Sequence, residues 1–108
     1  MCKILPAESW RRAGDVVPWS EDDERDGFMH LSTLEQVLDT ARRHFPGRRD
    51  LVALEIDEGA IADPVIYERS RSGALFPHLY GSLPRSAVIR VTGLAWTDGG
   101  YSFVSCDT

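Results

Sequence analysis

The chain has 108 residues, of which 43% are hydrophobic, and its formal net charge is −5. This length fits a single domain over residues 1–108, since a chain of this size buries roughly 60–70% of its unfolded surface. No apolar run approaches the roughly 18 residues that span a bilayer, so we expect a soluble protein that is not inserted in a membrane. The negative net charge makes nucleic acid an unlikely partner, because nucleic-acid-binding surfaces carry a basic excess.

The N-terminus indicates the compartment in which we expect the protein. Met1 to Leu5 is followed at once by Pro6 and Glu8, so the segment lacks the basic and apolar regions of a signal peptide. Cys2 and Cys106 stand near opposite ends of the chain, and this spacing favours reduced thiols over a disulfide. We therefore expect a cytoplasmic protein.

The first segment predicts a strand, a helix and an acidic loop. Cys2 to Leu5 is the strand, and Pro6 suits the first turn of a helix that ends by Gly14. Asp15 to Arg25 combines a proline with acidic residues, which favours a loop. We expect the acidic run Glu21 to Asp26 to be solvated, and a mobile flap over a cleft is the alternative.

The stretch Asp26 to Thr33 stands at a predicted junction between a strand and a helix. Phe28 to Leu31 is the strand, and Ser32 or Thr33 is the N-cap, with a Glu or Gln three residues further on at capping-box spacing. The buried face of the helix has helical spacing and comprises Leu34, Val37, Leu38, Ala41 and Phe45. We expect the free N–H groups at its start to lie near His30, where they suit an anion such as a phosphate.

The second half of the chain predicts mainly strands. Leu51 to Ile56 has the apolar pattern of a central strand. The segments that follow are a strand at Val65 to Glu68, a loop at Arg69 to Leu75, an extended segment at Phe76 to Gly81, and a hairpin of Val88 to Leu94 and Tyr101 to Val104 around Thr97 to Gly100. This order predicts an α+β fold with two main helices on a mostly antiparallel sheet.

His30 is the first candidate site residue. In a strand it shares a face with Phe28, while Met29 and Leu31 face the core, so its imidazole points to a groove or to solvent. Two interpretations stay open: a ligand contact beside the downstream N-cap, or a histidine tolerated on a half-open face.

A second group of candidates surrounds the aromatic segment Phe76 to Gly81. His78 and Tyr80 either line a pocket for a planar ring or close a core with their polar tips at the surface. Glu68 and Arg71 bracket a loop that contains serines, and they are candidates for an acid or base and for a phosphate clamp. An exposed salt bridge is the alternative.

Other chemistries lack their motifs. The three histidines have neither metal-ligand spacing nor a neighbouring cysteine, so we predict no metal site. The chain contains no nucleophile elbow, no P-loop and no glycine motif of the dinucleotide-binding type. A bound nucleotide would therefore occupy a different kind of site.

Three stretches carry a resemblance to a known family: Cys2 to Leu5 with Trp10 and Gly14, Asp26 to Thr33 with Glu35 and Gln36, and Phe76 to Gly81. From Cys2 to about Leu94 the chain resembles the short bacterial proteins grouped as domain of unknown function 952. The resemblance implies an ADP-ribosyltransferase-like fold with a mostly antiparallel, split sheet.

A second similarity is to the catalytic lobe of the NAD-dependent RNA 2′-phosphotransferases. It comprises His30 to Ser32, the helix that follows, Leu51 to Ile56, Tyr67 with Ser70 and Gly73, and Pro84 to Ile89. In those enzymes the histidine of the His-x-Ser motif belongs to the nucleotide-phosphate site, so the resemblance implies this role for His30 and Ser32. The chain departs from the superfamily in three ways: it has Lys3 where a histidine or arginine is usual, it lacks the second arginine-rich lobe, and Glu68 is only the nearest match to a catalytic glutamate.

These observations predict a cleft that binds NAD or a related phosphorylated nucleotide, in a transferase. The expected contacts are Lys3, His30 and Arg71 at phosphate, Ser32 at a ribose or as the helix cap, His78 and Tyr80 at the ring, and His30, His78 or Glu68 in catalysis. RNA is a less expected substrate. A non-catalytic module that senses a ligand or binds a partner is the alternative, and the third hypothesis is that both histidine motifs only satisfy buried hydrogen bonds.

Overall fold

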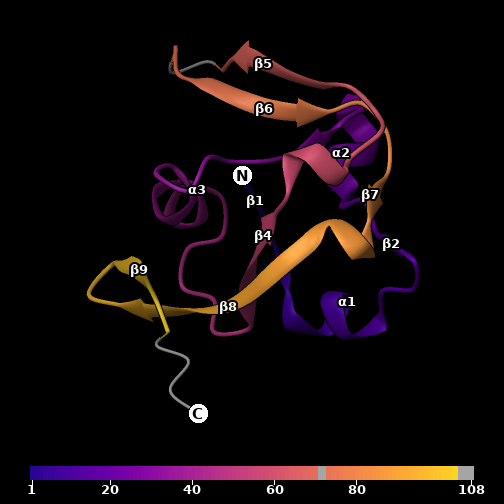
Figure 1. Cartoon of the computed structure of the whole chain (residues 1–108). Coiled ribbons are helices and arrows are strands. Elements are labelled where there is room, and N and C mark those ends of the chain that lie inside the picture. Colours follow the sequence, from indigo (N-terminus) through magenta and orange to yellow (C-terminus); the bar gives the residue numbers. More distant parts are fainter. Residues whose placement is uncertain (71–72, 105–108) are drawn as a thin grey trace.

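The computed structural model describes residues 1–70 and 73–104, and Figure 1 shows its arrangement. The strands are β1 (Cys2–Pro6), β2 (Val16–Val17), β3 (Met29–His30), β4 (Leu51–Ile56), β5 (Val65–Arg69), β6 (Leu75–Leu79), β7 (Leu83–Pro84), β8 (Val88–Thr97) and β9 (Gly100–Phe103). The helices are α1 (Ala7–Arg12), α2 (Glu21–Asp26) and α3 (Val37–His44), with short 3-10 helices η1 (Glu58–Ala60) and η2 (Arg85–Ala87). The predicted α+β class with mostly antiparallel sheets is confirmed.

A four-stranded sheet in the order β1-β4-β8-β9 forms the centre of the fold. Successive side chains of a strand point to opposite faces, so β4 contributes to two separate apolar clusters. Ala53 packs in the cluster that contains Val37 and Ala41 of α3. Leu54 packs in the cluster that contains Met29 of the β3-β6-β5 sheet. The central sheet is therefore covered by α3 on one face and by the smaller sheet on the other.

The smaller sheet has the order β3-β6-β5 and lies across the top of Figure 1. Its register places Met29 beside Leu79, both fully buried, and His30 beside His78. Cys2 and Ser32 link this region to β1 through two backbone hydrogen bonds of 2.6 and 2.9 Å. As a result, the segment that carries His30 lies next to the outer strand of the central sheet.

Helix α3 begins later than the sequence predicted. Residues 34–36 form a turn, so Leu34 is 54% exposed and does not belong to the buried face as expected. The capping-box spacing is realised between Thr33 and Gln36, each of which accepts the other's backbone N–H at 3.0 to 3.2 Å. Ser32 makes its backbone bonds to β1 instead, so its predicted role as the helix cap is wrong.

The segment Asp15 to Arg25, predicted as a loop, contains β2 and most of α2. Ser20 caps α2 in a capping box with Asp23, and Gly27 ends it with a φ of 83° in the left-handed region. A glycine adopts this conformation without strain. The fold therefore has three α-helices among the described residues, where two main helices were predicted.

The remaining predicted elements agree with the structure apart from their bounds. The hairpin turn between β8 and β9 has positive φ at Asp98 and Gly99, which suits a tight turn between twisted strands. Arg71 and Cys106, both named in the predictions, lie outside the described residues. Among the described residues, no helix is long and apolar enough to cross a membrane.

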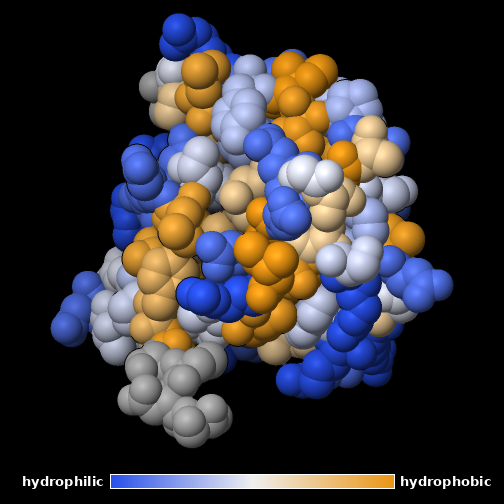
Figure 2. Space-filling model, viewed as in Figure 1, coloured by the Kyte–Doolittle hydropathy of each residue, from blue (hydrophilic) through white to orange (hydrophobic). Residues whose placement is uncertain are grey.

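Exposed apolar residues gather on the smaller sheet. Figure 2 shows apolar surface at the top of the molecule, where Figure 1 places β5 and β6. Ile66 and Leu75 are each 47% exposed there. More hydrophilic surface lies between the apolar patches on this face.

Candidate functional site

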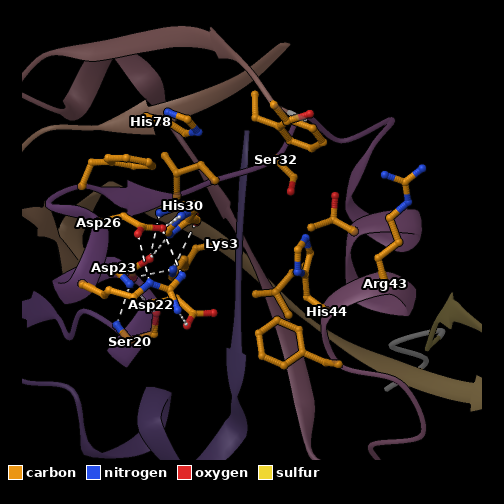
Figure 3. A pocket seen from close by; sticks show the side chains of 18 of the residues that line it. Lys3, Ser20, Asp22, Asp23, Asp26, His30, Ser32, Arg43, His44 and His78 are labelled. Atoms are coloured by element: carbon orange, nitrogen blue, oxygen red, sulfur yellow. Dashed lines mark hydrogen bonds and ion pairs between the residues drawn. The ribbon is translucent and has the colours of Figure 1, made fainter. Parts of the chain in front are cut away.

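The candidate site is a pocket of about 870 Å³ along the N-terminal strand β1. Lys3 and Ile4 of β1 line it, as do residues from α2, β3, β6 and the C-terminal half of α3. Figure 3 shows Lys3, Asp23 and His30 directed toward one another on one side and Arg43 and His44 of α3 on the other. All three histidines of the sequence, His30, His44 and His78, are among the lining residues.

Asp23 is the hub of the side of the pocket next to α2. Its side chain has no exposed surface, and its carboxylate accepts hydrogen bonds from Lys3 Nζ at 2.7 Å and from the Ser20 and His30 backbone N–H groups at 2.9 Å. A fourth contact of 2.7 Å joins Asp23 Oδ1 to His30 Nδ1. This single carboxylate therefore ties α2 to both β1 and β3.

In the ion pair of Lys3 and Asp23, burial and the charge of the partner shift each pKa in opposite directions. Burial alone would raise the pKa of the Asp23 carboxyl, but the hydrogen bond from His30 and the positive charge of Lys3 hold its pKa well below the usual range. Burial lowers the pKa of Lys3, and the neighbouring Asp23 opposes that shift. Lys3 Nζ also donates to the His30 backbone carbonyl at 3.1 Å, so the ammonium has two acceptors.

His30 is held between two carboxylates. Nδ1 lies 2.7 Å from Asp23 Oδ1, and Nε2 lies 2.9 Å from Oδ2 of Asp26, the last residue of α2. The side chain is 39% exposed, so the ring reaches the pocket although both of its nitrogens have partners. Because ionised carboxylates only accept hydrogen bonds, both contacts are hydrogen bonds only when both ring nitrogens carry a proton.

His78 forms a second cluster with Glu68 and Tyr80. Its Nδ1 lies 2.8 Å from Glu68 Oε1, and the Tyr80 hydroxyl donates to the same oxygen at 2.5 Å. Both bonds lower the pKa of Glu68, the bond from Tyr80 more strongly, while the Glu68 contact raises the pKa of Tyr80. Among the described residues, Nε2 of His78 has no hydrogen-bond partner. A carboxylate that holds Nδ1 in this way leaves Nε2 available to exchange a proton with a ligand.

Phe28 brings the two histidine clusters together. Its ring stacks on His78 with centroids 3.9 Å apart, and it lies 4.6 Å from the ring of His30. The two imidazole centroids are 5.8 Å apart, which follows from their pairing across β3 and β6. Both imidazoles therefore line the same pocket.

Basic residues also line the pocket: Arg43 and His44 of α3, on the other side from Lys3, and Arg69 of β5. The aromatic residues Phe45 and Phe76 line it as well. Arg43 pairs with Asp39 at 3.1 Å, and Arg69 donates to the Gly73 carbonyl at 2.9 Å. Each contact uses only part of the five-donor fork of a guanidinium, so both side chains retain donors for an anion.

Comparison with known proteins gives the chain a family. Residues 4–91 match the family described as "Protein of unknown function (DUF952)". The chain belongs to this family. No curated protein matches it.

Solved structures of a protein from Caulobacter crescentus are similar to this chain. A crystal structure of protein CC0527 from Caulobacter crescentus is 38% identical to the chain, with a TM-score of 0.84 over 94% of this chain and 91% of that chain. A crystal structure of its double mutant has the same values. The solution NMR structure of CC0527 is 37% identical, with a TM-score of 0.78 over 93% and 88% of the two chains.

In the structure of the present chain, the predicted site residues fall into three groups. His30, His78, Lys3 and Ser32 line the pocket, although Lys3 is paired with Asp23. Glu68 and Tyr80 are not among the lining residues, but Glu68 contacts His78 and the ring of Tyr80 lies 5.3 Å from that of Phe28, and both His78 and Phe28 line the pocket. The predicted Arg71 contact falls outside the described residues.

Two further expectations are corrected. α3 lines the pocket with Thr40 from its middle and with Arg43 and His44 from its last turn, so the anion site expected at the start of the helix is not part of this pocket. The acidic run is not a purely solvated loop, because Asp23 is fully buried and bonded. Among the described residues, no group of three or more His, Cys, Asp or Glu side chains is arranged to hold a metal ion.

Sequence reasoning missed Asp23 and the basic residues of α3. The spacing of Ser20 and Asp23, followed by Gly27, was the available signal for a short capped helix. Nothing local signalled that Asp23 would meet Lys3, which lies on another element. Arg43 and His44 belong to the exposed face of an amphipathic helix, where charge alone does not distinguish a ligand contact from solvation.

Proposed function

We propose that the pocket binds NAD or a related phosphorylated nucleotide, and that the protein is a transferase with an ADP-ribosyltransferase-like fold. The observation that carries the proposal is that His30 and His78 line one pocket with Arg43 and Arg69. The volume of about 870 Å³ lies within the range of about 300–1,000 Å³ common for ligand pockets. Two antiparallel sheets with a cleft at their junction are consistent with the proposed fold family.

The division of the pocket suits the parts of a nucleotide. Guanidinium groups bind phosphate oxygens through paired N–H donors, so Arg43 and Arg69 are assigned to the phosphates. Phe28 and Phe76 offer apolar ring surface for a base or another planar ring. Arg43 and Arg69 take the phosphate-binding role that the sequence suggested for Lys3, because the Lys3 ammonium is already paired with Asp23.

His78 is assigned the proton transfer. In transfer from NAD, the bond between the ribose carbon and the nicotinamide nitrogen breaks, and nicotinamide leaves with the electron pair. A hydroxyl or amine acceptor bonds to the ribose carbon, and its proton passes to His78 Nε2. Glu68 is assigned to position His78, because its carboxylate fixes Nδ1 as the protonated nitrogen.

A non-catalytic ligand-binding module is the second candidate. The observation that favours it is that each of the three carboxylates lining the pocket is already in an ion pair. These pairs are Asp22 with Arg25, Asp23 with Lys3, and Asp26 with Arg25 and His30. Such a pocket has no free carboxylate for catalysis among the described residues, so the catalytic role depends on His78.

Calorimetric titration with NAD, ADP-ribose and adenosine tests the binding proposal. We expect NAD and ADP-ribose to bind and adenosine to bind more weakly, because adenosine lacks the phosphates. His78→Ala and Arg43→Ala should weaken binding about tenfold, the loss of roughly one charged hydrogen bond. Arg12→Ala is the matched control, since Arg12 is exposed and does not line the pocket. No binding by the wild type at millimolar concentration refutes the proposal.

Release of nicotinamide from NAD separates the transferase from the binding module. The transferase releases nicotinamide at a rate that His78→Ala abolishes, whereas the binding module binds the same ligands without turnover. Glu68→Gln should lower the rate with a smaller effect on affinity, because Glu68 acts through His78.

A further inference from the structure

Asp26, which pairs with His30, carries a negative charge at the C-terminal end of α2. Asp26 is the last residue of the helix, next to the Gly27 cap, where the helix dipole disfavours a negative charge. Its carboxylate nevertheless lies 2.9 Å from His30 Nε2 and lines the pocket with its side chain 33% exposed. The Asp26 carboxylate pairs with Arg25 of its own helix and, inside the pocket, with His30.

We propose that Asp26 is an internal competitor for the ligand, its carboxylate occupying the position at His30 Nε2 that an anionic group of the ligand takes. The inference rests on the proposed function and adds a regulatory contact to that site. Nε2 is the ring nitrogen that can change partner, since Nδ1 is held by the buried Asp23. A phosphate oxygen would pair with Nε2 at the position that the Asp26 carboxylate occupies, so the two anions exclude each other there.

The surroundings of Asp26 allow this exchange. Arg25 pairs with Asp26 at 3.1 Å and with Asp22 at 3.1 Å, so it keeps one partner when Asp26 moves away. Gly27 follows Asp26 directly and has a φ of 83°. The space beside Gly27 is open, since a Cβ added there would have no atom within 4 Å. By contrast, Asp23 is fixed by four hydrogen bonds and stays with Lys3 and His30 Nδ1.

Titration of Asp26→Ala with ADP-ribose and with inorganic pyrophosphate tests the proposal. Asp22→Ala is the matched control, because it also removes one carboxylate of α2 from the pocket and from Arg25 but makes no contact with His30. We expect Asp26→Ala to bind both probes about fivefold more tightly than Asp22→Ala, the gain from removing one partly exposed ion pair. Asp26→Asn, which keeps an acceptor without the charge, should fall between them.

The outcomes distinguish this inference from the function on which it rests. Equal changes in Asp26→Ala and Asp22→Ala would show a general charge effect, and weaker binding by Asp26→Ala would make Asp26 a ligand contact. Either result overturns the inference while the proposed function stands. If neither the wild type nor a variant binds a phosphorylated probe, both are refuted.

A measurement without ligand tests the contact itself. In ¹⁵N spectra of the histidine rings, Asp26→Ala should change the Nε2 resonance of His30, and Asp22→Ala should leave it in place. An unchanged His30 resonance in Asp26→Ala overturns the inference whatever the titrations show.

Discussion

Asp23→Asn tests the buried hub with the largest expected effect. The substitution keeps the shape of the side chain but removes the charge that neutralises Lys3, whose side chain is 5% exposed. Breaking a buried ion pair by removing one partner costs about 3–5 kcal/mol. Against a total stability of about 5–15 kcal/mol for a domain, the variant folds with a small margin.

Thermal and urea unfolding measure this loss. A cost of about 3–5 kcal/mol corresponds to a melting temperature lower by about 12 °C or more in a domain of this size. Asp22→Asn is the control, since Asp22 is a neighbour on the same helix whose 62% exposed side chain pairs with the exposed Arg25. Its expected cost is below about 1 kcal/mol, as for other surface pairs.

A double-mutant cycle with Lys3→Met attributes the loss to the pair. Each single variant leaves a buried charge without its partner, so the double variant should lose clearly less free energy of unfolding than the two losses added. The reasoning is refuted if Asp23→Asn is no more destabilised than Asp22→Asn, or if the two losses simply add.

Three further predictions concern acid stability and two packing contacts. The folded pKa of Asp23 lies below the usual 3.8, so its stabilisation is complete above that value and is lost as pH falls toward the folded pKa. In chemical unfolding below pH 4, the free energy of unfolding should therefore fall more steeply with pH for the wild type than for Asp23→Asn. Gly81→Ala should lose about 1–3 kcal/mol, because its Cβ would lie 2.1 Å from Asp63 Oδ2, whereas Gly14→Ala meets no atom within 4 Å and should stay within about 0.5 kcal/mol. Tyr101→Phe should cost about 1–3 kcal/mol in urea unfolding, since the largely buried hydroxyl bonds to backbone groups between α3 and β4; a change below about 0.5 kcal/mol would contradict this role.

The elements that the sequence predicted well are those whose signal is local. The apolar pattern of Leu51 to Ile56 gave the central strand, and helical spacing correctly placed Val37 and Ala41 in the core. Leu34 had the same spacing but lies in the turn before the helix, because the bonds between Thr33 and Gln36 form before helical geometry begins. A periodic pattern identifies a face, whereas it does not locate the first helical residue.

Long-range contacts explain what the sequence could not reveal about the site. Helix α2 has only six residues, and they show no periodic apolar pattern. The burial of Asp23 therefore depends on its ion pair with Lys3 of strand β1. The sequence singled out His30 and His78 as candidates, but their register across two short strands is a property of the folded sheet. The basic wall at Arg43 is formed by the docking of α3, which no local motif encodes.

A titration with NAD followed by nuclear magnetic resonance tests the central claim most directly. The chain supplies its own reporters, because all three histidines line the pocket while Trp10 and Trp96 do not. We predict that the ring signals of His30 and His78 shift in a saturable way and that the indole signals of these two tryptophans stay in place. Histidine signals that do not move at millimolar NAD, or shifts confined to the indoles, would contradict a nucleotide site at this pocket.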